Sequence, residues 1–287
     1  MPKKYPKSKA SQEVPKFIQI ITKTFAFFSP KLTIWFAAKL FTTPIRHKLP
    51  KRELAMEAKS VQKSLTVTSI QKEIVVYEYG KSERKVLLVH GWSGRGTQLV
   101  KIADELLNNG FMTVSFDAPS HGKSKGSSTI MTEFIASILE IDKKYGPFEF
   151  TIGHSLGGMS ILNAIKQNYT TKKAVIIGSG DIIQDIIDDF IKKLTLQPKY
   201  GVLLKNYFEE KFVGNMDEYS AYKAAETVKI PVLIIHDTDD EDVSVKAAHN
   251  IHKHLKDSEI LITTGLGHRK ILGNDEVIQK INHFLDI

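Results

Sequence analysis

The pentapeptide Gly153-His154-Ser155-Leu156-Gly157 constrains this chain more than any other feature, because of what surrounds it. An apolar run, Phe148 to Ile152, precedes it, and a stretch typical of a helix, Met159 to Ile165, follows it. Glycines two positions either side of a serine let a strand turn sharply into a helix without Cβ clashes. We therefore predict that Ser155 is an exposed nucleophile, whereas the alternative is an ordinary glycine-rich turn after a buried strand.

A serine nucleophile also needs a histidine to take its proton and a carboxylate to orient that histidine. An apolar run typical of a buried parallel strand, Ile230 to His236, is followed by the acidic cluster Asp237 to Asp242. A second strand-like run, Glu259 to Thr263, precedes a glycine-flanked loop that holds His268. Because active sites of open α/β sheets lie at the carboxyl ends of the strands, we expect these groups at the same edge as Ser155.

The order of nucleophile, acid and histidine is that of α/β-hydrolases. From about Val61 to its C-terminus the chain resembles serine hydrolases of that family, and it is similar to an uncharacterised, esterase-like bacterial subgroup. The resemblance rests on the pentapeptide, on the acid and histidine loops, and on Val86 to Trp92 and Phe116 to Ser124. It implies an α/β-hydrolase fold, which is a mostly parallel sheet with helices on both faces and a helical lid.

The resemblance also implies roles for individual residues. The triad is Ser155 as nucleophile, His268 as base and Asp240 as acid, with Asp239 as the fallback for the acid. Many relatives have glycine where this chain has Asp237, a departure that limits what substrate can be inferred.

Two backbone amides, those of Trp92 and Leu156, are expected to form the oxyanion hole. The implied activity is that of a cofactor-independent serine hydrolase without a metal, which cleaves a small-molecule ester or thioester through an acyl-enzyme. Peptidase, amidase and lipase activities stay open, because acyl specificity depends on the lid. The rival from another class is a non-catalytic binding protein with the same fold.

Other motifs favour structural roles. Gly91, Gly94 and Gly96 follow a strand, but their Gly-x-x-Gly-x-Gly spacing differs from the dinucleotide fingerprint, so we expect no nucleotide site. His121 is expected in a structural turn. Three further histidines are expected on a solvated helix rather than at a metal: His249, His252 and His254.

Composition narrows the class of protein. The 287 residues are 42% hydrophobic, as in a globular protein, and contain no cysteine, which excludes disulfides and thiolate chemistry. The net charge of +8 is spread along the chain except near the N-terminus, where a single acid, Glu13, accompanies five lysines: Lys3, Lys4, Lys7, Lys9 and Lys16. No nucleic-acid-binding motif accompanies these lysines, so we expect no nucleic-acid partner. We expect a cytoplasmic protein, for which the lack of cysteine is no disadvantage.

Residues 1 to 60 are expected to form a basic, amphipathic helical extension. Apolar faces around Phe17 to Phe28 and Leu32 to Leu40 meet at Ser29-Pro30, a cap followed by a first-turn proline. Two interpretations remain open. The first, which we favour, is a helical hairpin packed on the hydrolase core; the second is an anchor through which residues 1 to 45 contact the inner membrane surface, as a membrane-surface lipase or amidase would.

From residue 61 to 287 we expect one catalytic domain. A short antiparallel pair precedes alternating strand-like and helix-length segments, a pattern that predicts a mostly parallel sheet with helices on both faces. About residues 180 to 229 interrupt the alternation with a helical stripe of their own. We expect this insertion to be the lid.

Overall fold

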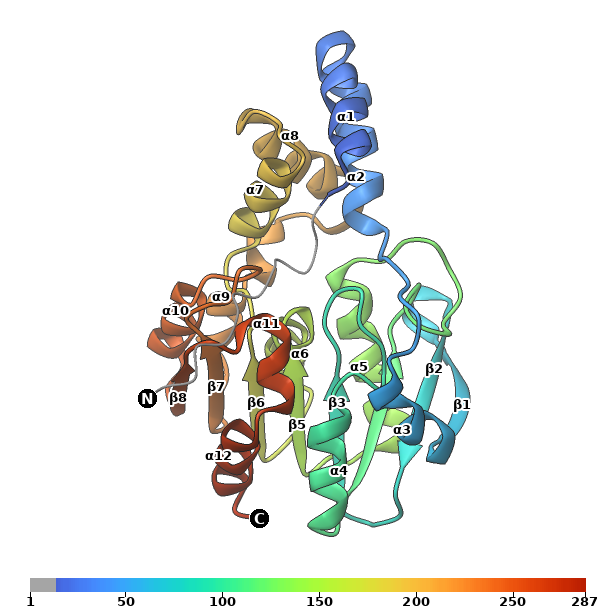
Figure 1. The fold of residues 1–287 in the computed structure, drawn as a ribbon, viewed down its shortest axis with the longest axis vertical. Helices are drawn as coiled ribbons and strands as arrows, with labels where there is room; N and C mark the ends of the chain where they lie inside the picture. Colours follow the sequence, from blue (N-terminus) through green and yellow to red (C-terminus); the bar gives the residue numbers. More distant parts are fainter. Residues whose placement is uncertain (1–13) are drawn as a thin grey trace.

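The computed structural model describes residues 14–287, which form one eight-stranded sheet flanked by helices (Figure 1). The strand order is β1-β2-β4-β3-β5-β6-β7-β8; β2 runs antiparallel to β1 and β4, and the other neighbours are parallel. The strands are β1 Val61–Val67, β2 Lys72–Tyr79, β3 Lys85–Val89, β4 Met112–Asp117, β5 Phe150–His154, β6 Lys173–Ile177, β7 Val232–Asp237 and β8 Ser258–Thr263. The predicted antiparallel pair and the predicted mostly parallel sheet are both confirmed.

The apolar runs of the parallel strands have two buried faces. In β3, Leu87 and Val89 join one core while Val86 and Leu88 join the other, as the period of two requires. The first core is covered by α5 Met131–Tyr145, α6 Leu156–Lys166 and α10 Lys246–His254, and the second by α4 Val100–Asn108 and α12 Asp275–Leu285. Helices therefore cover both faces of the sheet, as the sequence predicts.

The segment between β6 and β7 carries several helical elements, of which the first two stand beyond the edge of the sheet (Figure 1). They are α7 Ile183–Lys193, α8 Lys199–Phe208, a π-helical turn Glu209–Val213, a 3-10 turn Met216–Tyr219 and α9 Ala221–Ala225. In α7 the buried residues recur at Ile183, Ile187 and Ile191, so one helical face packs inward while charged residues occupy the other. We refer to residues 180–229 as the insertion.

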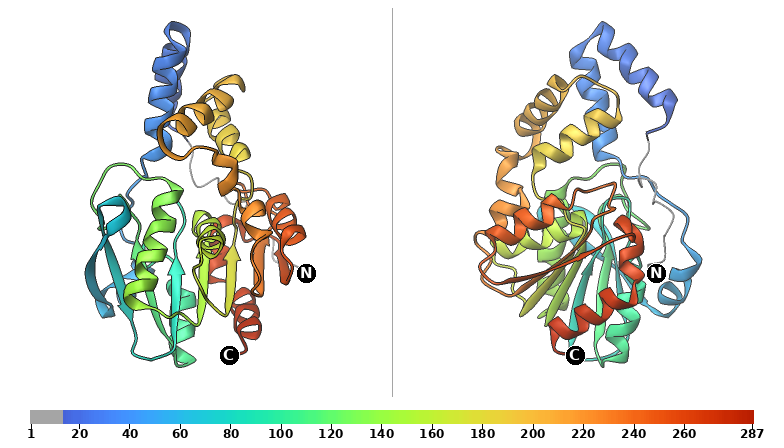
Figure 2. Two further views of the ribbon diagram at one scale, coloured as in Figure 1. Left: turned by 180° about the vertical axis from the view of Figure 1, so that it is seen from behind. Right: turned by 60° about the vertical axis from the view of Figure 1, so that its left-hand side comes forward.

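A helical hairpin, α1 Lys16–Phe28 and α2 Pro30–Thr42, projects beside the insertion (Figures 1 and 2). The Ser29 hydroxyl caps α2 by accepting the Leu32 N–H at 3.3 Å. Phe41 of α2 packs on Phe190 and Phe208 of the insertion, with ring centroids 5.1 and 5.5 Å apart. The hairpin therefore packs mainly on the insertion, and the Thr129 N–H donates to the Thr42 carbonyl at 2.8 Å where α2 meets the rest of the domain.

Most of the N-terminal lysine cluster lies outside the described residues, because only Lys16 of that group falls within 14–287. After α2, a short helix α3 Leu54–Lys59 precedes β1. None of the helices in residues 14–287 combines the length and the apolar character needed to cross a bilayer.

Candidate active site

Ser155 lies on the turn between β5 and α6, with φ 54° and ψ −121°. Close packing explains the two glycines of the pentapeptide. A Cβ on Gly157 would lie 2.4 Å from the Val89 carbonyl oxygen, and one on Gly153 would lie 2.5 Å from Ile161 Cδ1. The tight strand–turn–helix expected from the sequence is present, and it holds the serine in a conformation that is strained for an L-residue.

His268 follows β8, in α11 Gly267–Lys270, and its Nδ1 donates to Asp240 Oδ2 at 2.7 Å. The other oxygen of Asp240, Oδ1, accepts the backbone N–H groups of Asp242 and Val243, each at 2.9 Å. Burial would raise the pKa of Asp240, but hydrogen bonds from His236 and His268, the charge of His268 and the Val243 amide hold that pKa well below its usual range. Asp240 therefore presents a fixed, ionised carboxylate to His268.

Asp239, the fallback acid, occupies a different environment. Its side chain is exposed, and the Thr238 hydroxyl donates to it at 3.5 Å, at the limit of a hydrogen bond. The structure thus brings Asp240, and not Asp239, to His268.

Three residues support this pair, although the sequence did not assign them that role. His236 is fully buried at the end of β7, and its Nε2 lies 3.4 Å from Asp240 Oδ2 and 2.9 Å from the Val243 carbonyl. His154 precedes Ser155 in the chain, and its Nε2 lies 2.9 Å from the His268 carbonyl oxygen. His154 directly precedes Ser155 and His236 lies four residues before Asp240 in the sequence, but only the fold shows which atoms these histidines contact.

Asp237 is the third, and it explains the departure from glycine. Its Oδ1 accepts the Asp239 N–H at 2.9 Å, while its Oδ2 accepts the Thr263 hydroxyl at 2.7 Å and the Leu266 N–H at 3.0 Å. The buried carboxylate of Asp237 therefore connects the loop that carries Asp240 to the segment that precedes His268.

The loop after β3 runs close to Ser155, and several of its backbone N–H groups have acceptors. Gly91 N–H donates to the Gln98 side chain, Ser93 N–H to His121 Nε2 and Gly94 N–H to the Gly91 carbonyl. Within residues 14–287, Trp92 N–H has no such acceptor, and neither has Leu156 N–H in the first turn of α6. A Cβ on Gly91 would lie 2.9 Å from Ser155 Cβ, which shows how closely this loop approaches the serine. The two expected amides are thus available to an oxyanion.

His121 and His90 brace this loop, in agreement with the structural turn expected for His121. His121 Nε2 accepts from Ser93 while its Nδ1–H donates to the Pro119 carbonyl. His90 Nε2 accepts the Ala118 N–H at 3.0 Å, so its Nδ1–H donates to the Gly91 carbonyl at 2.7 Å. Both imidazoles are held in a neutral tautomer by an N–H that they must accept.

Stability should fall as the pH drops from about 6.5 towards 4. Burial lowers the pKa of His90 from 6.5 to about 4, and burial also lowers the pKa values of His121 and His154. Below pH 6.5 these histidines bind protons in the unfolded chain but not in the folded chain, so the free energy of unfolding falls. Above pH 6.5 they are neutral in both states and do not change the free energy of unfolding with pH. His90 alone accounts for about 3 kcal/mol. Urea unfolding at pH 8, 6.5, 5 and 4.5 measures the effect, and equal free energies of unfolding at pH 8 and 4.5 would contradict it.

Asp240, Asp242 and His268 are the described residues whose potential ligand atoms lie within 4.8 Å of one another. In this cluster Asp240 and His268 already bind each other, so the donor set suits a hydrogen-bonded pair. The helical histidines also have local partners: His252 Nδ1 lies 2.8 Å from the Ser258 hydroxyl, and His254 Nδ1 lies 2.8 Å from the Asn250 carbonyl.

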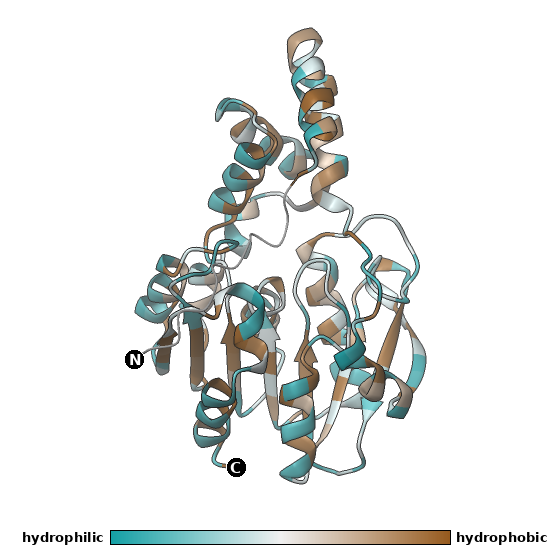
Figure 3. Ribbon diagram, viewed as in Figure 1, coloured by the Kyte–Doolittle hydropathy of each residue, from teal (hydrophilic) through white to brown (hydrophobic). Residues whose placement is uncertain are grey.

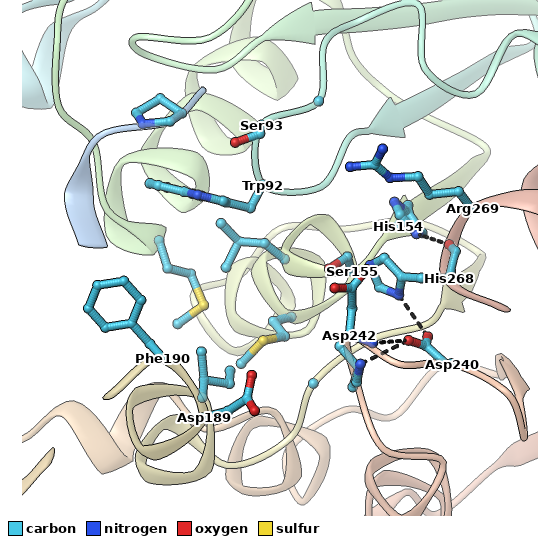
Figure 4. Close-up of a pocket in the computed structure, with 18 of the residues that line it drawn as sticks. Trp92, Ser93, His154, Ser155, Asp189, Phe190, Asp240, Asp242, His268 and Arg269 are labelled. Carbon is cyan, nitrogen blue, oxygen red and sulfur yellow. Dashed lines mark hydrogen bonds and ion pairs between the residues drawn. The ribbon is translucent and has the colours of Figure 1, made fainter. Parts of the chain in front are cut away.

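Ser155 and His268 open into a cavity of about 1520 Å³ between the sheet edge, the insertion and the hairpin. In the close-up the Ser155 side chain lies next to the His268 imidazole, with Trp92 and Phe190 further along the wall (Figure 4). Among the described residues Ser155 Oγ makes no hydrogen bond, and such contacts often tighten only when substrate binds. Apolar side chains from all three parts line the space, among them Ile18, Leu40 and Phe41 of the hairpin, Ile183, Ile186, Phe190 and Phe208 of the insertion, and Met131 and Met159 of the domain core.

Known proteins share this fold. The family model described as the alpha/beta hydrolase family matches residues 86–277. An esterase of Pyrococcus furiosus superposes with a TM-score of 0.66 at 17% identity, covering 85% of this chain and 97% of its own. A bromoperoxidase from Bacillus anthracis superposes with a TM-score of 0.62 at 16% identity, covering 79% of this chain and 100% of its own. A membrane phospholipase A, described as a bacterial virulence factor, superposes with a TM-score of 0.62 at 14% identity, covering 94% of this chain and 96% of its own. No curated protein sequence matches the chain. At these identities the likeness concerns the fold alone.

Proposed function

The chain belongs to the alpha/beta hydrolase family, and from that premise we propose that it is a serine hydrolase that cleaves a carboxylic ester or thioester through an acyl-enzyme. One observation carries the proposal. A buried, ionised Asp240 holds the Nδ1–H of His268 at 2.7 Å, so the Nε2 lone pair of that imidazole is left to face the cavity that Ser155 lines.

The reaction follows from these positions. Ser155 Oγ attacks the substrate carbonyl carbon while its proton passes to His268 Nε2, and the N–H groups of Trp92 and Leu156 receive the oxyanion. His268 then protonates the departing alcohol or thiol, which leaves an acyl ester on Ser155. A water molecule, deprotonated by His268, cleaves that ester, releases the carboxylic acid and restores the serine. Asp240 stays ionised throughout and stabilises the imidazolium.

We assign residues 61–287 to the catalytic domain and the insertion at residues 180–229 to its lid. Residues 1–60 form an N-terminal extension, whose described part, residues 14–60, carries the helical hairpin. The lid and the extension supply most of the apolar wall of the cavity, from Ile183 and Phe190 on one side and Phe41 on the other. Such a wall favours an acyl group of several carbons over an acetyl group, because each buried methylene contributes about 0.8 kcal/mol.

A panel of p-nitrophenyl esters with acyl chains from two to twelve carbons tests the proposal, with acyl thioesters in parallel. We expect hydrolysis, with kcat/KM rising by up to about fourfold per methylene from the acetate to chains of medium length. A protein that binds without catalysis would cleave none of these substrates. A preference for the acetate would show that the cavity does not receive the acyl chain.

A further inference from the structure

One face of the N-terminal hairpin is apolar and exposed. In α1, the side chains of Ile20, Phe27 and Phe28 are 65%, 84% and 74% exposed. They share this face with Phe17 and Ile21, and the spacing of three, four and seven residues places all five on one side of the helix. We call these five residues the outer face of α1.

The opposite side of the hairpin is the packed side. Thr22 of α1 and Thr33, Ile34 and Ala37 of α2 are buried, and Gln19 Nε2 donates to the Lys193 carbonyl of the insertion at 3.2 Å. These contacts fix the side that faces the protein. The hairpin projects from the rest of the molecule, and apolar residues recur along its length (Figures 2 and 3).

All the formal charges around the outer face of α1 are positive. Residues 14 to 52 contain eight lysines and arginines and no aspartate or glutamate. Four of the lysines, Lys16, Lys23, Lys31 and Lys39, belong to the hairpin, and no ion pair involves them among residues 14–287. A surface that joins exposed phenylalanines to unneutralised lysines matches the acyl and headgroup regions of an anionic bilayer.

We propose that the outer face of α1 docks on an anionic membrane surface. A second copy of the chain fits less well, because pairing two hairpins would bring lysines together without an acid in either hairpin to neutralise them. The docked hairpin is also a wall of the cavity, since Ile18 and Phe41 line it from within. Docking therefore places the cavity beside the lipid, and it depends on the hairpin alone, whether or not Ser155 is a nucleophile.

Co-sedimentation of the full-length protein with vesicles tests the proposal. We expect binding to phosphatidylglycerol–phosphatidylcholine vesicles, weak binding to phosphatidylcholine alone, and loss of binding in high salt. The double change Phe27→Asp and Phe28→Asp should weaken the partition more than about 100-fold. Lys23→Gln should weaken it about fivefold. The matched control is Leu54→Asp, a half-exposed leucine of α3, which should bind as the wild type does.

Trp35 gives a second measurement, because it is 48% exposed on α2 of the same hairpin, with Lys39 Nζ 5.6 Å from its ring centroid. Its emission should shift to shorter wavelength with anionic vesicles, and Trp35→Phe should remove that shift while sedimentation persists. Three results would overturn the proposal: no binding to anionic vesicles, equal binding by the phenylalanine double variant, or a lipid-independent dimer in light scattering that the double variant abolishes. Ester hydrolysis does not enter any of these readouts, so docking and catalysis are judged separately.

Discussion

Replacing Ser155 by Ala should lower kcat for ester hydrolysis by about a million-fold, the scale seen when a serine triad loses its nucleophile. The methyl group cannot form the acyl-enzyme, so only binding and the oxyanion-hole amides would remain to assist attack by water. The fold should persist, because Ser155 Oγ makes no hydrogen bond within residues 14–287 and an alanine Cβ occupies the same place. Steady-state kinetics on the best ester of the panel measure the loss.

A fluorophosphonate probe gives an independent readout of the same change. The wild type should be labelled at Ser155 and the alanine variant should not. Ser244→Ala is the matched control, because Ser244 is an exposed serine that lines the same cavity, and that variant should be labelled as the wild type is. Persistent labelling of the Ser155 variant would show that another residue is the nucleophile.

The sequence sufficed for those features that depend on local spacing. The pentapeptide predicted the turn at Ser155, because Gly153 and Gly157 are required by contacts within a few residues of the turn and with the neighbouring strand. The apolar runs predicted the parallel strands. The order of the acidic cluster and His268 after two of those strands predicted that they would meet at the same edge of the sheet, and the resemblance to α/β-hydrolases singled out Asp240 within the cluster.

Features that depend on contacts across the fold were not accessible in this way. Asp237 stood out in the sequence only as a departure from glycine, and its role depends on Thr263 and Leu266, which are distant in the chain. His154 likewise acts on the carbonyl of His268, 114 residues later. Local periodicity describes an element but does not say which loop its polar atoms will meet.

The N-terminal hairpin illustrates the same limit. Helical periodicity predicted both helices, yet the two open interpretations treated packing and exposure as alternatives. The structure has both: buried Thr22 and Ile34 on the side toward the protein, and exposed Phe27 and Phe28 on the other. A helix with apolar residues around most of its circumference can have two partners, and sequence alone does not apportion the residues between them.

Asp240→Asn should lower kcat by about ten-thousand-fold and leave the protein folded. Asp240 Oδ1 accepts two backbone N–H groups, from Asp242 and Val243, so the carbonyl oxygen of the asparagine must take that place. Its NH₂ group then replaces Oδ2 and points at His268 Nδ1, which must become an acceptor. The imidazole proton moves to Nε2, the nitrogen needed to receive the proton of Ser155, so the base is lost while both backbone N–H groups keep their acceptor.

Asp239→Asn is the matched control, since Asp239 is the adjacent carboxylate and is exposed. It carries the same change in charge within one residue of the acid, so any general electrostatic effect of removing a carboxylate should appear in both variants. We expect the Asp239 variant to keep kcat within a few-fold of the wild type, with thermal unfolding recorded for both proteins. A large loss of kcat in the Asp239 variant together with an unchanged kcat in the Asp240 variant would reverse the assignment of the acid. Equal, small losses in both would instead mean that His268 does not depend on a carboxylate for its tautomer.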